Sequence, residues 1–242
     1  MKRRIVTAAI LIPVVLGAVL YSNSTPLWVL ATLVAVVAAV ELAVIVGVSG
    51  VLLAVLTLGS GLAGYHFSAY ALLWPVLWMA DCAFLLARPK AIFGFLYLSV
   101  PLTSIAFLHD IRPEFALLPF VPLWIGDTLA ILVGRKWGKN PMAPTISPKK
   151  TWEGGAANFL GCMAGAIALA SWLNLSVVVG LLVGLSAGLL GQVGDLFESQ
   201  LKRRAGVKDS GGLLPGHGGV LDRIDSILFA APAIFLIVRL LN

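Results

Sequence analysis

Glycines and acidic residues lie together in one polar segment near the end of the chain. Five of the nine residues from 211 to 219 are glycine, so the backbone there can approach a ligand closely. A helix is expected to follow, with Asp222 and Asp225 on one face of its first turn. These carboxylates could cap the helix and complement its dipole, or they could bind a hard cation such as Mg2+, which takes oxygen ligands.

A second polar group lies where a long apolar run ends. If the helix continues there, Asp195, Glu198 and Lys202 share one face at spacings of three and four residues. Asp195 lies close to the membrane end of the apolar run and needs a partner, because the charge of a carboxylate is costly to bury there. An ion pair with Lys202 or Arg203 and a bound metal ion both satisfy this requirement.

A basic segment over 147–154 reads Ser-Pro-Lys-Lys-Thr-Trp-Glu-Gly. Lys149 and Lys150, flanked by Ser147 and Thr151, could grip phosphate oxygens as point charges. They could equally form an anchor beside the membrane that touches anionic lipid headgroups. The residues alone leave both interpretations open.

Three further carboxylates lie inside apolar runs, where an ionisable residue is a functional candidate by default. Asp127 ranks first among them, because Thr128 and the basic pair Arg135-Lys136 follow it. Glu41 and Asp81 lack polar neighbours in the sequence, and we expect them to matter less.

The elements that must position these residues are membrane helices. Of 242 residues, 60% are hydrophobic and 12% charged, against about 45–50% and about 25% in soluble domains. The predicted fold class is therefore all-α, a polytopic transmembrane helical bundle of about nine spans. The expected spans are 5–21, 27–47, 50–65, 68–87, 91–108, 115–134, 155–173, 176–197 and 226–241.

The distribution of basic residues predicts the orientation of these spans. With the N-terminus in the cytoplasm, 15 of the 17 Lys and Arg residues fall on the cytoplasmic side, and only Arg112 and Arg239 fall outside. The first apolar run is expected to remain as a helix rather than to be removed as a signal peptide. The net charge of +6 is then explained by cytoplasmic loops, and no nucleic-acid partner is expected.

A single membrane domain with two regions is expected. Residues 1–114 form N-terminal transmembrane helices, and residues 115–242 form the catalytic region, with functional cytoplasmic loops at 135–154 and 198–225. Cys82 and Cys162 lie in separate apolar runs and are expected to be small core residues rather than zinc ligands.

The segment from Ser199 to Asp225 resembles the signature of the phosphatidate cytidylyltransferases, also called CDP-diacylglycerol synthases. The matching positions are Ser199, Lys202, Arg203, Lys208, Asp209, Pro215, His217, Gly218, Gly219, Asp222, Arg223, Ile224 and Asp225. The runs 147–154 and 194–196 resemble other blocks of that family. The resemblance covers residues 124–227 well. Over the first hundred residues it is limited to their general hydrophobic character.

The resemblance implies transfer of CMP from CTP to phosphatidate, giving CDP-diacylglycerol and pyrophosphate at the cytoplasmic face of a membrane. It further implies Mg2+ and K+ as cofactors and a homodimer. The expected metal ligands are Asp195, Asp222 and Asp225, with Glu198 as a weaker candidate. The expected phosphate-binding cations, most of them also catalytic, are Lys149, Lys150, Lys202, Arg203 and Arg223. Further substrate contacts are expected from Ser147, Thr151, Lys208, His217, Gly218, Gly219 and Asp127.

Two other functional classes are compatible with parts of the sequence. A CTP-dependent polyprenol kinase or an ether-lipid cytidylyltransferase would use similar cations and metal ligands. An ion or solute transporter could use Asp127 and Asp195 inside the membrane, although the densest polar segments lie in loops and we find no internal repeat. The sequence contains no P-loop or Rossmann fingerprint.

Overall fold

The computed structural model describes residues 13–21, 23–66, 89–213 and 218–242, and most of these are helical. Six helical segments are long and apolar enough to cross a membrane: Thr25–Val46, Pro89–Ile111, Pro113–Trp137, Trp152–Trp172, Val177–Arg204 and Leu221–Leu241. The all-α prediction is therefore confirmed, and the apolar helices indicate an integral membrane protein.

Nine spans were expected, and six of them correspond to these six segments. The expected span at 50–65 is helix α3 (Gly50–His66), an apolar helix of 17 residues that is shorter than the other six. The expected span at 68–87 lies outside the described residues, as do residues 5–12 of the span at 5–21, whereas residues 13–20 of that span are helical. The number of nine spans stays a prediction.

The chain divides into two compact units. Unit 1 contains residues 1–113 and 204–224, and unit 2 contains residues 114–203 and 225–242. The polar segment that follows Arg203 therefore belongs with the N-terminal helices, although nearly a hundred residues separate the two parts of unit 1 in the sequence.

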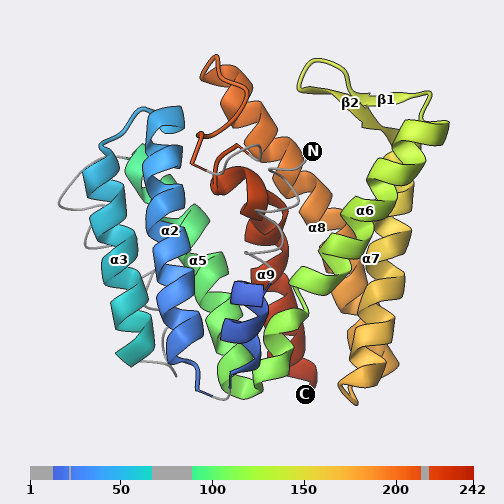
Figure 1. The fold of residues 1–242 in the computed structure, drawn as a ribbon, viewed down its shortest axis with the longest axis horizontal. Helices are drawn as coiled ribbons and strands as arrows, with labels where there is room; N and C mark the ends of the chain where they lie inside the picture. Colours follow the sequence, from blue (N-terminus) through green and yellow to red (C-terminus); the bar gives the residue numbers. More distant parts are fainter. Residues whose placement is uncertain (1–12, 22, 67–88, 214–217) are drawn as a thin grey trace. The chain divides into compact units, whose positions relative to one another are not determined.

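In unit 1, helix α2 (Thr25–Val46) packs on α3 and on α5 (Pro89–Ile111), as Figure 1 shows. The interface is apolar, and Leu42, Leu53 and Leu98 are fully buried in it. Helix α5 is the most enclosed of the candidate spans, and both α2 and α3 pack against it.

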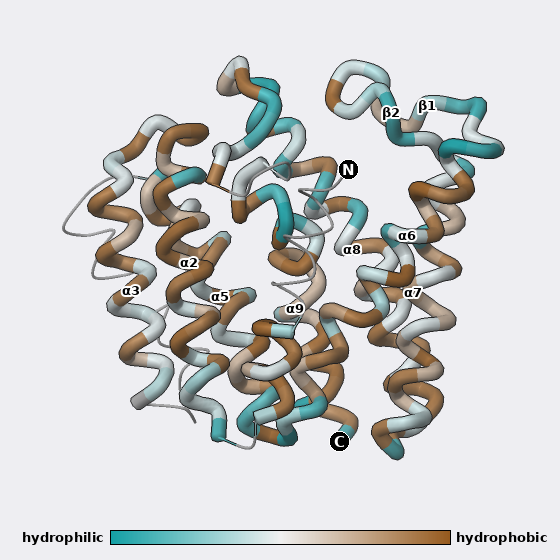
Figure 2. Tube along the Cα trace, in the orientation of Figure 1, coloured by the Kyte–Doolittle hydropathy of each residue, from teal (hydrophilic) through white to brown (hydrophobic). Residues whose placement is uncertain are grey.

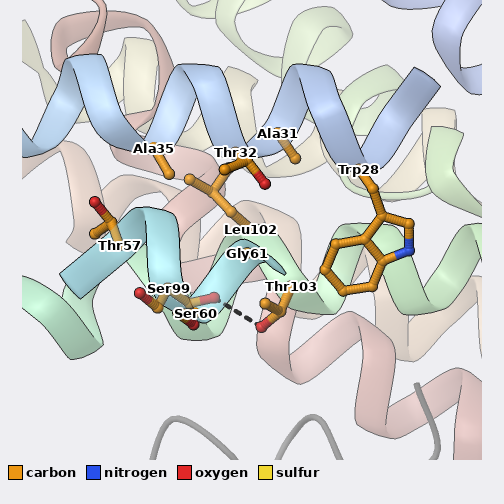
Figure 3. Close-up of a pocket in the computed structure, with 10 residues that line it drawn as sticks. All are labelled: Trp28, Ala31, Thr32, Ala35, Thr57, Ser60, Gly61, Ser99, Leu102 and Thr103. Atoms are coloured by element: carbon orange, nitrogen blue, oxygen red, sulfur yellow. Dashed lines mark hydrogen bonds between the residues drawn. The ribbon is translucent and has the colours of Figure 1, made fainter. Parts of the chain in front are cut away.

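A small cavity lies between α2, α3 and α5 (Figure 3). Its walls carry several hydroxyl groups, and the Thr103 hydroxyl donates to the Ser99 carbonyl at 2.7 Å. The space measures about 10 Å³, whereas sites for small-molecule ligands occupy about 300–1,000 Å³. The cavity therefore has room for about one water molecule and not for a nucleotide or a lipid headgroup.

Unit 2 is built around helices α6 (Phe120–Trp137) and α7 (Trp152–Trp172), which pack closely along their length. Small residues allow this approach: a Cβ on Gly126 would lie 2.8 Å from the backbone oxygen of Asn158, and one on Gly161 would lie 3.0 Å from the Cα of Gly126. Gly161 and Gly165 form the small-residue spacing that is typical of helix pairs in membranes.

Large apolar side chains on the outer faces of unit 2 point away from the protein interior. Leu132, Leu160 and Leu189 each expose more than half of their surface. Hydrophilic residues instead gather at the end of α6 and α7 that carries the two short strands β1 (Pro141–Ala143) and β2 (Ser147–Thr151), as Figure 2 shows. This separation is what a protein with lipid on its sides and water at its ends requires.

We predict that Gly126→Ala lowers the thermal stability of the purified protein in detergent. The added methyl group has no space against α7, and overpacking of this kind costs about 1–3 kcal/mol. Gly17→Ala is the matched control, because a Cβ there meets nothing within 4 Å. Equal melting temperatures for the two variants would contradict the tight packing of α6 on α7.

Candidate active site

Helix α8 (Val177–Arg204) continues through the polar residues that follow its apolar part. The sequence prediction that Asp195, Glu198 and Lys202 share a helical face is thereby confirmed. Glu198 is fully buried, and its Oε2 atom lies 2.6 Å from the Lys202 ammonium one turn later. The sequence analysis offered Lys202 or Arg203 as an ion-pair partner of Asp195. The structure pairs Lys202 with Glu198, and the ion-pair partner of Asp195 is Lys150 on β2.

The basic segment at 147–151 forms a strand rather than an irregular loop. Strand β2 pairs with β1 in an antiparallel hairpin, which the sequence analysis did not predict. Successive side chains of a strand point to opposite faces, so the two adjacent lysines have different environments. Lys150 places its ammonium 2.5 Å from Oδ2 of Asp195, whereas Lys149 is exposed.

Side chains of unit 2 hold this hairpin at both ends. The Arg203 guanidinium donates from Nε to the Ile146 carbonyl at 3.1 Å, which ties α8 to the turn between the strands. The Thr151 hydroxyl accepts the backbone N–H of Gly154 and caps α7. Arg203 and Thr151, both expected to contact substrate, thus also hold Lys150 in position.

Asp225 brings a third carboxylate to this region of unit 2. It lies on helix α9 (Leu221–Leu241) and interacts electrostatically with Asp195, Glu198 and Lys150. Gly194 makes this possible, because a Cβ there would lie only 2.6 Å from the Asp225 backbone oxygen. We call Asp195, Glu198 and Asp225 the acidic cluster.

The acidic cluster is compatible with Mg2+, although no three His, Cys, Asp or Glu side chains in the described parts of the chain are arranged as a complete metal site. Protein sites for Mg2+ commonly use one or two carboxylates, with water and substrate phosphates as the remaining ligands. Asp195 and Asp225 offer such oxygen donors. Glu198 suits this role less well, because it is fully buried against Lys202.

Asp222 belongs to unit 1 and organises the glycine-rich segment there. Its Oδ2 atom accepts the backbone N–H groups of Gly219 at 2.8 Å and of Ser210 at 3.0 Å. A side chain on Gly218, which has φ +86°, would collide with the same carboxylate. The capping interpretation of Asp222 therefore has direct support, and its role as a metal ligand stays a prediction.

Glu41, which has no polar neighbours in the sequence, acquires polar partners from a distant segment in the structure. Glu41 as a whole is 8% exposed, and its carboxylate accepts hydrogen bonds from the Ser210 hydroxyl and from the backbone N–H groups of Val220 and Leu221. These donors lie about 170 or more positions later in the chain. The sequence did contain an indication of this contact. Glu41 is a lone carboxylate in an apolar helix, and such a carboxylate needs a partner from elsewhere in the chain.

The remaining expected site residues are spread over both units. Asp127 of α6 accepts a hydrogen bond from Nδ2 of Asn158 on α7 at 2.9 Å. Lys208 and Arg223 are exposed side chains of unit 1. His217 and Asp81 lie outside the described residues.

Replacing Lys202 alone is predicted to destabilise the protein strongly. Lys202→Met removes a counter-ion of the buried Glu198, and breaking a buried pair in this way costs about 3–5 kcal/mol. The double variant Lys202→Met with Glu198→Gln should recover much of the loss in melting temperature. Arg204→Met, two residues along and exposed, is the control, and a Lys202→Met protein as stable as this control would contradict the prediction.

Several known proteins are similar in sequence to this chain over more than a hundred residues. A phosphatidate cytidylyltransferase from Staphylococcus aureus is 40% identical over 146 residues, which are 57% of this chain and 56% of the relative. Phosphatidate cytidylyltransferase 5 from the chloroplast of Arabidopsis thaliana is 46% identical over 128 residues, which are 51% of this chain and 31% of that protein. The match thus spans a little more than half the length of the bacterial relative and about a third of the length of the plant relative.

A family model covers far more of the chain than these pairwise matches do. The model described as the cytidylyltransferase family matches residues 2–241. The match includes both units, with the acidic cluster and its lysines in one and the glycine-rich segment in the other. The protein therefore belongs to the cytidylyltransferase family.

Proposed function

We propose that this protein transfers CMP from CTP to phosphatidate and releases pyrophosphate. The observation that carries the proposal is the 40% identity over 146 residues to proteins named phosphatidate cytidylyltransferase. The acidic cluster with Lys150 and Lys202 supports it, because a reaction between two phosphate groups needs cations and metal-binding carboxylates at one place.

The proposed reaction needs little proton transfer. The phosphate of phosphatidate is a monoester whose second pKa is about 6, so it is largely dianionic at pH 7. One of its oxygens attacks the α-phosphorus of CTP, a new P–O bond forms, and the bond to the β-phosphate breaks, releasing pyrophosphate. The main barrier is repulsion between two anions together with charge on the leaving group, so catalysis depends on positioning and on cations.

Residues of both units have roles in this proposal. Lys149, Lys150, Lys202, Arg203 and Arg223 neutralise phosphate groups of the two substrates. Further substrate contacts come from Ser147, Thr151, Lys208, His217, Gly218, Gly219 and Asp127. Asp195 and Asp225 of unit 2 would hold Mg2+, which would supply positive charge for the phosphates of CTP. Asp222 of unit 1 stays an expected metal ligand, and K+ stays the expected second cation.

Lys150 has a specific task that its contact with Asp195 suggests. The ammonium neutralises the carboxylate at a separation of 2.5 Å, and both side chains remain about one-third exposed. A phosphate group that enters can therefore replace the carboxylate as the partner of Lys150. Asp195 would then be released to bind the metal that accompanies the nucleotide.

The proposed topology places this chemistry at the cytoplasmic face. Nine spans with the N-terminus in the cytoplasm would put 15 of 17 basic residues on that side. Phosphatidate can then reach the site from the bilayer while CTP enters from the cytoplasm, and no nucleic acid is involved. The proposed assembly is a homodimer.

The reaction is tested by incubating the purified protein with phosphatidate, Mg2+, K+ and CTP labelled at the α-phosphate. Wild type should move the label into lipid and release one pyrophosphate for each lipid labelled. Asp195→Asn should lower the rate by about 100-fold or more, because it removes a metal-binding charge where phosphate charge develops. Asp110→Asn, an exposed carboxylate at the end of α5, is the matched control.

Other outcomes identify the competing functions. Release of CDP with unlabelled lipid phosphate would indicate a CTP-dependent kinase. Ion or solute flux in vesicles without any turnover of CTP would indicate a transporter. Either result, with folded protein, would overturn the proposed reaction.

The adjacent lysines of β2 provide a second test of the site. Lys150→Met should raise the KM for CTP about tenfold more than Lys149→Met does, because only Lys150 contacts the acidic cluster and a hydrogen bond between charged groups contributes about 1.5–3 kcal/mol. Steady-state kinetics at saturating phosphatidate measure both values. An equal rise in the KM for CTP in both variants would show that the contact of Lys150 with the acidic cluster gives it no special role in CTP binding.

A further inference from the structure

We propose that Glu41, on the second helix of the chain, is a positioning residue for the nucleotide. Its carboxylate fixes the two flanks of the glycine-rich segment, residues 209–213 and 218–220, which we call the loop flanks. Through them it sets the affinity for the triphosphate of CTP. The inference rests on the proposed function, because it takes CTP as the nucleotide.

The contacts of Glu41 reach both loop flanks within unit 1. Its Oε2 atom accepts the Ser210 hydroxyl at 3.1 Å and the Leu221 backbone N–H at 2.8 Å. Its Oε1 atom accepts the Val220 backbone N–H at 3.1 Å. One carboxylate therefore joins the beginning of the segment, its end and the first residue of α9.

Two glycines are needed for this approach. A Cβ on Gly211 would lie 2.5 Å from Oε1 of Glu41, and a Cβ on Gly219 would lie 2.5 Å from Oε2. A Cβ on Gly219 would also collide with the Ser210 hydroxyl. The loop flanks thus fold directly onto the carboxylate, and even alanine at either position would push them away.

Because Glu41 is buried, these hydrogen bonds are strong, and losing them would be costly. Glu41 is the sole charged residue of α2, whose sequence is otherwise almost entirely apolar, and a buried carboxylate without hydrogen bonds is very costly. The N–H groups of Val220 and Leu221 lie at the N-terminus of α9, where the helix dipole favours a negative charge. Glu41 therefore takes the place of a capping side chain, although it comes from another helix.

Asp222 is a second carboxylate that accepts hydrogen bonds from the loop flanks. Ser210 donates its backbone N–H to Asp222 and its hydroxyl to Glu41, so one residue connects the two carboxylates. The two carboxylates together hold the backbone of the loop flanks by hydrogen bonds that need no ligand. Such preorganisation improves binding because less conformational entropy is lost when the nucleotide arrives.

The test compares wild type with Glu41→Gln, Ser210→Ala and the control Asp110→Asn. Glu41→Gln keeps the shape of the side chain but removes its charge and places an NH2 group opposite backbone donors. We expect CTP to bind about tenfold more weakly, in line with the loss of about one charge-assisted hydrogen bond. Ser210→Ala removes one donor of three, should fold normally, and should weaken CTP binding less.

Three measurements separate positioning from a loss of stability. Calorimetry gives the Kd for CTP in the presence of Mg2+, kinetics give the KM for phosphatidate, and hydrogen exchange reports the backbone amides of residues 219–221. Weaker CTP binding, an unchanged KM for phosphatidate and faster exchange would support the positioning role. A purely structural role would lower the fraction of active protein and leave both constants unchanged.

Each remaining outcome also decides between the two proposals. Unchanged CTP affinity in both Glu41→Gln and Ser210→Ala would overturn the role of Glu41 and leave the proposed reaction intact. If wild type binds CTP but labels no lipid, the reaction fails, and the CTP affinities still decide the role of Glu41. If wild type binds no CTP, both proposals fall.

Discussion

The cost of placing a carboxylate in an apolar helix determines much of this structure. Glu41, Asp127 and Glu198 each meet this cost in a different way. Glu41 binds backbone and hydroxyl donors from a distant segment, Asp127 binds the Asn158 amide, and Glu198 forms an ion pair with Lys202. Glu41 and Asp127 thereby fix contacts between different elements, whereas the pair of Glu198 and Lys202 lies within α8.

Two polar segments, the hairpin of unit 2 and the glycine-rich segment of unit 1, are held by hydrogen bonds from side chains. The hairpin depends on Arg203 and on the cap at Thr151, and the glycine-rich segment depends on Glu41 and Asp222. Both segments are polar and have little apolar surface to bury. Hydrogen bonds to charged groups are the available means of ordering them, and they are directional enough to define a geometry.

The sequence was sufficient for features that are local or periodic. The helical register of α8 placed Asp195, Glu198 and Lys202 on one face, and the apolar runs marked the six candidate spans and the shorter helix α3. The sequence was insufficient for contacts between distant segments, such as that of Glu41 with Ser210. The hairpin was also missed, because the five residues of β2 include a proline and two lysines and show no alternation of apolar and polar residues.

The strand that carries the adjacent lysines makes the site unusually sensitive to insertions and deletions. In a helix, the loss of one residue rotates the side chains that follow by about 100°, but in a strand it moves them to the opposite face. A single deletion in the turn at 144–146 would therefore exchange the environments of Lys149 and Lys150 without changing the composition of the strand. A one-residue deletion that is harmless in most surface turns would here put Lys149 in the position that Lys150 now occupies.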